Sequence, residues 1–234
     1  MSVWLPITVL LWLCWAALAS RAHRLAPRPN PVSGFAVLAV RGYARVFHRL
    51  RVKAAERIPA TRSPGPLIVV ANHASGADPL LIQAACPFEI TWIMGADMAH
   101  PWLGALWRSA GVITVDRKNA SGFPLREALR ALRDGRVLGI FPEGRIARPA
   151  RRLQPFHPGA SLLIERSGAP VLPFLITGAP TSANAWTDLL TTSRAVVRPL
   201  GEPAAPPRAG SREHATALRE VFRRESGWPL AEEA

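Results

Sequence analysis

The sequence of 234 residues has few cysteines and few acidic side chains. Its two cysteines, Cys14 and Cys86, show no paired spacing, and Cys14 lies inside an apolar run. This pattern supports neither a disulfide framework nor a zinc site. We therefore predict no bound metal and no resident cofactor.

Acidic residues number 16 against 29 lysines and arginines, which leaves a formal net charge of +13. Such a charge predicts attraction to polyanions: nucleic acid, anionic lipid headgroups, phosphorylated substrates or an acidic carrier protein. The basic residues are scattered, and aromatic residues do not recur between them as they do on a base-stacking surface. We therefore expect an anionic partner other than nucleic acid.

An uncharged segment, Val3–Ser20 (VWLPITVLLWLCWAALAS), precedes the body of the chain. As a helix it is about 27 Å long, close to the hydrocarbon thickness of a bilayer, and it is predicted to anchor the chain in a membrane. The alternative is a cleaved signal peptide, because Ala17-Leu-Ala19 resembles a cleavage site. Basic residues follow the segment rather than precede it, which favours an anchor in the inner membrane with the rest of the chain on the cytoplasmic side. These residues are Arg21, Arg24 and Arg28.

A basic amphipathic stretch, Phe35–Val52, follows the proline-rich linker Ala26–Pro31. As a helix it suits either the headgroup plane of an anionic membrane or packing on a protein core. The chain is thus divided into a hydrophobic segment with its linker (1–30), an amphipathic helix (31–60) and a main domain (61–234). Apolar residues make up 49% of the chain, enough for one sizeable core.

Short β-rich apolar runs alternate with helical stretches in the main domain. This rhythm predicts an α/β fold with a mixed, largely parallel sheet covered by helices. The predicted strands are 67–70, 91–94, 112–115, 137–141, 171–176 and 195–198. The predicted helices are 79–85, 99–109, 123–133, 158–167 and 212–225, with Gly135 and Gly168 as stop signals.

His73 and Asp78 directly follow the apolar run Leu67–Val70. An imidazole can take a proton from a hydroxyl near neutral pH, and a carboxylate can hold its tautomer and stabilise the imidazolium. In the alternative interpretation, His73 is a turn residue and Asp78 is the N-cap of a helix that opens at Pro79. The two interpretations are compatible, because a capping carboxylate can also hold an imidazole.

Three further polar blocks follow or begin predicted strands, where an α/β sheet brings residues to a common crevice. In Gly111–Arg117 (GVITVDR), Arg117 can bind a phosphate or simply pair with its neighbour on the surface. In Phe141–Arg145 (FPEGR), Glu143 can bind a substrate hydroxyl, pair with a catalytic cation or remain a solvated turn residue. In Ala169–Phe174 (APVLPF), two prolines bracket a strand entry and can form a pocket wall.

These four blocks, in this order, resemble the glycerolipid acyltransferase family, which comprises 1-acyl-glycerol-3-phosphate acyltransferases and related lysophospholipid acyltransferases. The resemblance extends over about Leu67–Leu200. It implies that His73 is the general base and Asp78 its orienting partner. It also implies that Arg117 holds the acceptor phosphate, that Glu143 and Gly144 position the glycerol, and that Pro173 shapes the site. The expected partners are a lysophospholipid, acyl-CoA or acyl carrier protein as the thioester donor, and an anionic membrane.

The chain departs from the family pattern near the expected acceptor site. Arg145 stands where the family often has Thr or Ser, and His157 where it usually has Lys or Arg. Arg145 can strengthen phosphate binding, suit another headgroup or lie in a solvated basic loop. The acceptor is thus lysophosphatidic acid or another lysolipid, such as a lyso-aminolipid.

Two functions from other classes remain open. In a lipid ester hydrolase, Ser75 or a metal-bound water would attack the ester, but Ser75 is not in a Gly-x-Ser-x-Gly elbow. His73 and Asp78 alone provide too few ligands to fix a metal. In a non-catalytic lipid-binding module, the N-terminal segments and the basic surface would bind the membrane.

Overall fold

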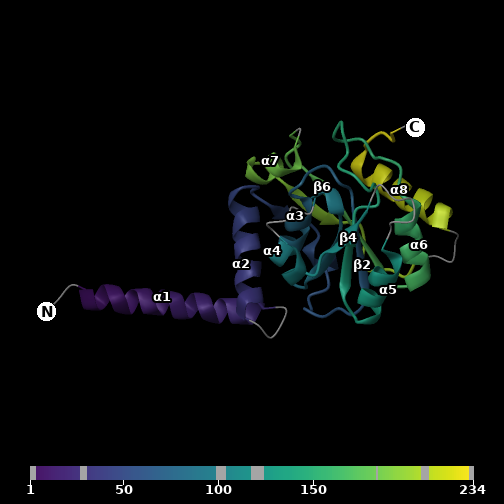
Figure 1. Cartoon of the computed structure of the whole chain (residues 1–234). Coiled ribbons are helices and arrows are strands. Elements are labelled where there is room, and N and C mark those ends of the chain that lie inside the picture. Colours follow the sequence, from purple (N-terminus) through teal and green to yellow (C-terminus); the bar gives the residue numbers. More distant parts are fainter. Residues whose placement is uncertain are drawn as a thin grey trace.

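The computed structural model describes residues 4–26, 31–98, 104–116, 124–182, 184–206 and 211–231. A twisted sheet lies at the centre of the body, with helices on both faces, and an N-terminal helix projects away from it (Figure 1). The strands are β1 (Arg51–Val52), β2 (Leu67–Ala71), β3 (Ile90–Gly95), β4 (Ile113–Val115), β5 (Val137–Ile140), β6 (Val171–Thr177) and β7 (Val196–Pro199).

The strand order is β1-β7-β6-β2-β5-β3-β4, with β2 in the centre. Within the described residues, every pair of neighbouring strands is parallel except β6 and β7. The prediction of a mixed, largely parallel sheet is confirmed, and each predicted strand is present. The two-residue edge strand β1, which pairs with β7, was not predicted.

Each predicted helix has a counterpart in the structure, although residues 99–103 of the helix predicted over 99–109 and residue 123 of the helix predicted over 123–133 lie outside the described residues. The helices are α1 (Trp4–Leu25), α2 (Pro31–Val46), α3 (Asp78–Ala85), α4 (Gly104–Ser109), α5 (Leu125–Arg133), α6 (Pro158–Ser167), α7 (Ala185–Leu190) and α8 (Ser211–Ser226), with short 3-10 turns at η1 (Ala55–Arg57) and η2 (Ala96–Met98). Helix α7 was not predicted. The amphipathic helix expected over Phe35–Val52 ends at Val46, because residues 51–52 pair with β7 instead.

Two apolar cores lie on opposite faces of the sheet, and the alternation along β2 separates them. Leu67, Val69 and Ala71 pack on the side of α2 and α3, whereas Ile68 and Val70 pack on the side of α5, α6 and α8. All five side chains are at most 2% exposed. A strand buried on both faces reads as a continuous apolar run, which is why β2 is so apolar in the sequence.

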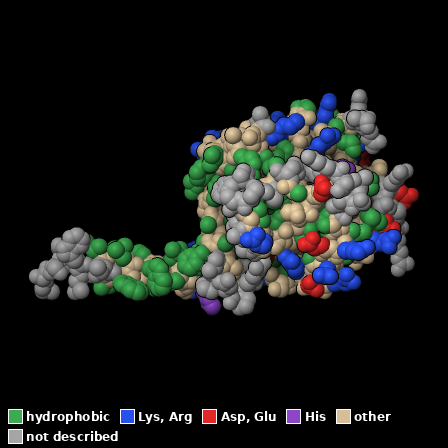
Figure 2. Space-filling view, viewed as in Figure 1, with side chains coloured by type: hydrophobic (Ala, Val, Ile, Leu, Met, Phe, Trp, Pro, Cys, Tyr) green, Lys and Arg blue, Asp and Glu red, His purple; other side chains and the backbone are tan. Residues whose placement is uncertain are grey.

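Helix α1 projects from the body and exposes apolar side chains along its length (Figures 1 and 2). The exposed fractions lie between 48% and 68% for Ile7, Val9, Leu10, Leu11, Trp12, Leu13, Trp15 and Leu18. It joins α2 where Ala22 is fully buried against Gly34, a glycine whose added Cβ would lie 1.9 Å from the Ala22 carbonyl oxygen.

Among the residues described, no helix combines the length and the apolar character that crossing a bilayer requires. The transmembrane prediction for residues 3–20, which begin outside the described part of the chain, therefore gains no support. Helix α2 packs against α3, and its Ala44 is buried in the core. Of the two alternatives for this helix, the headgroup plane of a membrane or a protein core, this contact shows packing on the core.

Candidate active site

The ends of two neighbouring parallel strands bring His73 and Glu143 together. His73 lies two residues after β2, and Glu143 lies three residues after β5. Because β2 and β5 run in parallel in register, their carboxyl ends open at the same edge of the sheet. The backbone N–H of His73 donates to Oε1 of Glu143 at 2.8 Å.

The carboxylate of Asp78 contacts Nδ1 of the His73 imidazole. Nδ1 of His73 lies 3.0 Å from Oδ2 of Asp78, whose side chain is completely buried. The same oxygen accepts the backbone N–H groups of Ala74 and Ser75, each at 2.8 Å. Because the carboxylate only accepts, Nδ1 carries the hydrogen and Nε2 is left as the proton acceptor. We call the segment between the two residues, 74–77, the catalytic loop.

The alternative interpretation, in which Asp78 is the N-cap of a helix that opens at Pro79, is wrong. Helix α3 begins at Asp78 itself, its N-cap residue is Ala77, and no side chain caps it. The carboxylate of Asp78 instead turns back over the catalytic loop toward His73.

Aromatic rings fix the plane of the His73 imidazole. The ring of Phe141 stacks on it with centroids 4.0 Å apart and planes 15° apart. Trp92 of β3 stacks on the other side of Phe141, at 5.0 Å and 10°. With Nδ1 held by Asp78 and the ring plane held by Phe141, the direction of Nε2 is determined.

Glu143 is buried, with only 3% of its surface exposed, and both of its oxygens accept backbone hydrogen bonds. Oε1 accepts from His73 and Oε2 accepts the N–H of Gln154 at 3.1 Å. Burial raises the pKa of Glu143 to about 7, although these two N–H donors favour its carboxylate. Its position makes it a support for the His73 backbone.

A cavity of about 1650 Å³ opens in front of His73. Its lining includes Glu143, Gly144 and Arg145 from the turn after β5, together with apolar residues of α2, β3 and α7. This volume exceeds the usual range for small-molecule sites, and the mainly apolar wall suits a long hydrocarbon chain.

The remaining predicted site residues lie in different places. Gly144 has φ +66°, and a Cβ there would come within 2.8 Å of His157, so the turn requires glycine. Arg145 is exposed at the cavity wall. Pro173 sits within β6 beside Val70 and is not among the described residues that line the cavity. Arg117 lies outside the described residues.

Sequence reasoning missed several residues that build the site. Asn72, the residue before His73, is 1% exposed and exchanges two hydrogen bonds with the backbone of Ile176, at 2.8 and 3.0 Å. This pairing ties the end of β2 to β6. The sequence places Phe141 and Trp92 only in predicted strands, because no local pattern indicates that Phe141 stacks on His73 and Trp92 on Phe141.

The geometry is that of a proton-transfer site. A neutral imidazole with Nδ1–H held by a buried carboxylate can accept a proton at Nε2 from a hydroxyl in the cavity. Among the described residues, no cluster of three or more His, Cys, Asp or Glu side chains could hold a metal ion.

Comparison with known proteins identifies the family. The model of the Acyltransferase family matches residues 49–177, more than half of the chain. The chain is 29% identical over 115 residues to the 1-acyl-sn-glycerol-3-phosphate acyltransferase of Helicobacter pylori, covering 48% of each protein. It is 32% identical over 131 residues to the N-acylphosphatidylethanolamine synthase of Arabidopsis thaliana, covering 50% of this chain and 44% of that protein.

A solved structure has a similar fold. The crystal structure of the 1-acyl-sn-glycerophosphate acyltransferase PlsC from Thermotoga maritima superposes with a TM-score of 0.65 at 22% identity, covering 87% of this chain and 84% of that one. The chain spans about half the length of the curated relatives that it matches. The matched region includes both strand ends that form the site, and the chain belongs to the Acyltransferase family.

Proposed function

We propose that the chain transfers a fatty acyl group from an acyl thioester to the free hydroxyl of a lysophospholipid, with 1-acyl-glycerol-3-phosphate as the principal acceptor. The observation that carries this proposal is the contact between His73 and Asp78, with His73 lining a large, mainly apolar cavity. The names of the curated relatives support this acceptor.

In the proposed reaction, Nε2 of His73 takes the proton of the acceptor hydroxyl as its oxygen attacks the thioester carbonyl. The new C–O bond forms first, and the C–S bond then breaks as the intermediate collapses. The imidazolium returns its proton to the departing thiolate, so His73 is regenerated and no covalent enzyme intermediate forms. Asp78 keeps the imidazole in the correct tautomer and stabilises its charged form.

The acceptor phosphate is proposed to bind near Arg145 at the cavity wall, and near Arg117 as the family resemblance implies. Both guanidinium groups suit a phosphate, which they can bind through two parallel hydrogen bonds. The acyl donor, whether acyl-CoA or acyl carrier protein, would place its chain along the apolar wall of the cavity.

We also propose that the protein works at the cytoplasmic face of the inner membrane, with α1 inserted into one leaflet of an anionic bilayer. Eight exposed apolar side chains on one projecting helix favour this placement, because burying them in the acyl region removes them from water. Replacing Leu11 and Trp12 together by serine should weaken flotation of the protein with vesicles that contain anionic lipid.

The test of the reaction uses the full chain, a labelled acyl thioester and a panel of lysolipids, with products identified by mass. His73→Ala should abolish acyl transfer, whereas His23→Ala, on the exposed end of α1, should not. Retained turnover by His73→Ala would overturn the mechanism. Release of free fatty acid without any acceptor would indicate a hydrolase instead.

The acceptor site has a separate test. Arg117→Ala should raise KM for the acceptor and leave KM for the thioester unchanged. Arg126→Ala, an exposed arginine on α5, is the matched control. An unchanged acceptor KM in Arg117→Ala would remove Arg117 from phosphate binding.

A further inference from the structure

A second carboxylate, Asp188 of α7, contacts the catalytic loop at a different backbone amide from those that Asp78 binds. Its side chain is completely buried, yet it is not among the described residues that line the cavity. Oδ2 of Asp188 accepts the backbone N–H of Gly76 at 3.0 Å. A buried carboxylate on a loop amide is costly to desolvate, so its contacts must compensate for that cost.

Arg148 contacts the same loop and pairs with Asp188. One guanidinium nitrogen donates to the carbonyl oxygen of Ala74 at 2.7 Å, and the other lies 3.4 Å from Oδ2 of Asp188. The two charged side chains thus bind a backbone carbonyl and a backbone N–H that are two residues apart. We call this pair, Arg148 and Asp188, the loop clamp.

The clamp is itself held in place. The second oxygen of Asp188 accepts both the backbone N–H and the hydroxyl of Ser182, each at 2.7 Å, and Arg148 donates to the Ser182 carbonyl at 2.7 Å. The loop also sits directly against α7, because a Cβ on Gly76 would lie 2.1 Å from the carbonyl oxygen of Ala185. The loop can adopt this position only with glycine at residue 76.

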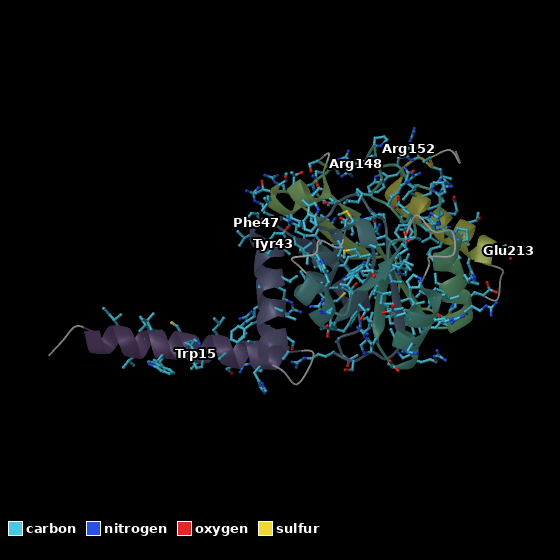
Figure 3. All side chains as sticks on the ribbon, in the orientation of Figure 1. Trp15, Tyr43, Phe47, Arg148, Arg152 and Glu213 are labelled. Carbon is cyan, nitrogen blue, oxygen red and sulfur yellow. The ribbon has the colours of Figure 1, made fainter. Side chains whose placement is uncertain are left out.

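Helix α7 is also tied to α2. The hydroxyl of Tyr43 donates to the carbonyl of Leu189, the residue after Asp188, at 2.7 Å. Figure 3 shows Tyr43 at the end of α2 that lies nearest α7, with Arg148 on the loops beyond α7. The Asp188 carboxylate therefore belongs to a short helix that contacts both α2 and the catalytic loop.

We propose that Arg148 and Asp188 are positioning residues that hold the catalytic loop in the conformation in which Asp78 orients His73. The loop amides of Ala74 and Ser75 are the donors that fix Oδ2 of Asp78, so a shift of the loop disturbs the carboxylate that holds Nδ1. This inference rests on the proposed acyl transfer. The clamp touches neither His73 nor Asp78 in these contacts: it binds the loop backbone, and the loop backbone binds Asp78.

The test compares Asp188→Asn, Arg148→Ala and the double variant with the wild type. In Asp188→Asn, one rotamer places an amide N–H against the N–H of Gly76, and the other places it against the donors of Ser182. Each single variant should lower kcat by about 10- to 100-fold per folded molecule, since small misplacements of a catalytic group carry penalties of this order. KM for both substrates should stay unchanged, and the double variant should lose little more than the worse single variant.

Matched controls remove the same chemical groups elsewhere. Asp134→Asn and Arg152→Ala change exposed residues outside the clamp and should leave kcat unchanged. Arg148→Lys, which keeps a positive donor near Ala74, should recover part of the activity. Should Asp188→Asn not fold, Arg148→Ala carries the test, because the Arg148 side chain is 35% exposed.

Hydrogen exchange measured by mass spectrometry provides a readout independent of turnover. Exchange of the peptide that contains residues 74–77 should accelerate in both clamp variants and not in the controls. Unchanged exchange there, additive losses of kcat, or losses that vanish after correction for the folded fraction would each overturn the clamp. A wild-type chain that transfers no acyl group, while loop exchange still accelerates, would overturn the proposed function and leave the clamp intact.

Discussion

Replacing Glu143 by glutamine should remove a pH-dependent cost from the folded protein. Burial raises the pKa of Glu143 from 4.5 to about 7. Between these values the folded protein keeps a proton on Glu143 that the unfolded chain has already released. The folded state binds more protons, so the free energy of unfolding should fall as the pH rises through this window. Glutamine does not titrate, and the variant should lack this decline.

The magnitude follows from the size of the shift. Each pKa unit corresponds to about 1.4 kcal/mol, so a rise from 4.5 to about 7 corresponds to about 3 kcal/mol of lost stability by pH 8. Glutamine also leaves the N–H of His73 or of Gln154 without an acceptor, at a pH-independent cost of about 1–3 kcal/mol. The variant should therefore be less stable than the wild type at pH 5 and equally or more stable at pH 8.

Urea unfolding in mild detergent at pH 5, 6, 7 and 8 measures this difference directly. Other groups titrate in both proteins, so the difference between the two curves isolates Glu143. Glu165→Gln, which changes an exposed residue of α6, should give a flat difference curve. A flat curve for Glu143→Gln as well would refute the reasoning and would mean that Glu143 is solvated in the folded protein.

Three further predictions concern the rings and buried groups around the site. Gly139→Ala places a Cβ 2.5 Å from the ring of Trp92, and should lower the free energy of unfolding by about 1–3 kcal/mol, as measured with urea. Phe141→Leu removes the ring stacked on His73 and should lower kcat by roughly two- to tenfold in steady-state assays without raising KM. Burial lowers the pKa of His48, so wild-type stability should fall as the pH drops below 6.5, and His48→Gln should lack that part of the fall in urea titrations.

The fold was predictable where local patterns coincide with burial. The strand at 67–71 is buried on both faces and is therefore continuously apolar, and Gly135 and Gly168 end their helices with φ of +75° and +60°. Helix α7 has six residues and strand β1 has two, lengths at which hydrophobic periodicity carries little information. Their presence depends on tertiary contacts with α2 and β7.

The same distinction applies to the site. His73 and Asp78 flank one short loop, five residues apart, so their pairing leaves a local signal in the sequence. Asp188 meets Gly76 across 112 residues of chain, and Arg148 meets Ala74 across 74, so no spacing could connect them. The residues that we propose for the chemistry were visible from the sequence, whereas the residues that hold their loop in place required the fold.

The start of α3 shows why helix capping and orientation of the His73 imidazole are separate tasks here. A capping side chain accepts the N–H of the second or third residue of a helix. The second residue of α3 is Pro79, which has no N–H, and the N–H of the third, Leu80, donates to the carbonyl of Ala77 at 3.0 Å. The helix start therefore needs nothing from the Asp78 carboxylate. That carboxylate instead accepts hydrogen bonds from two loop N–H groups and from Nδ1 of His73. Because Pro79 provides no N–H, the start of α3 places no capping demand on this carboxylate, and both loop amides and Nδ1 of His73 meet its Oδ2.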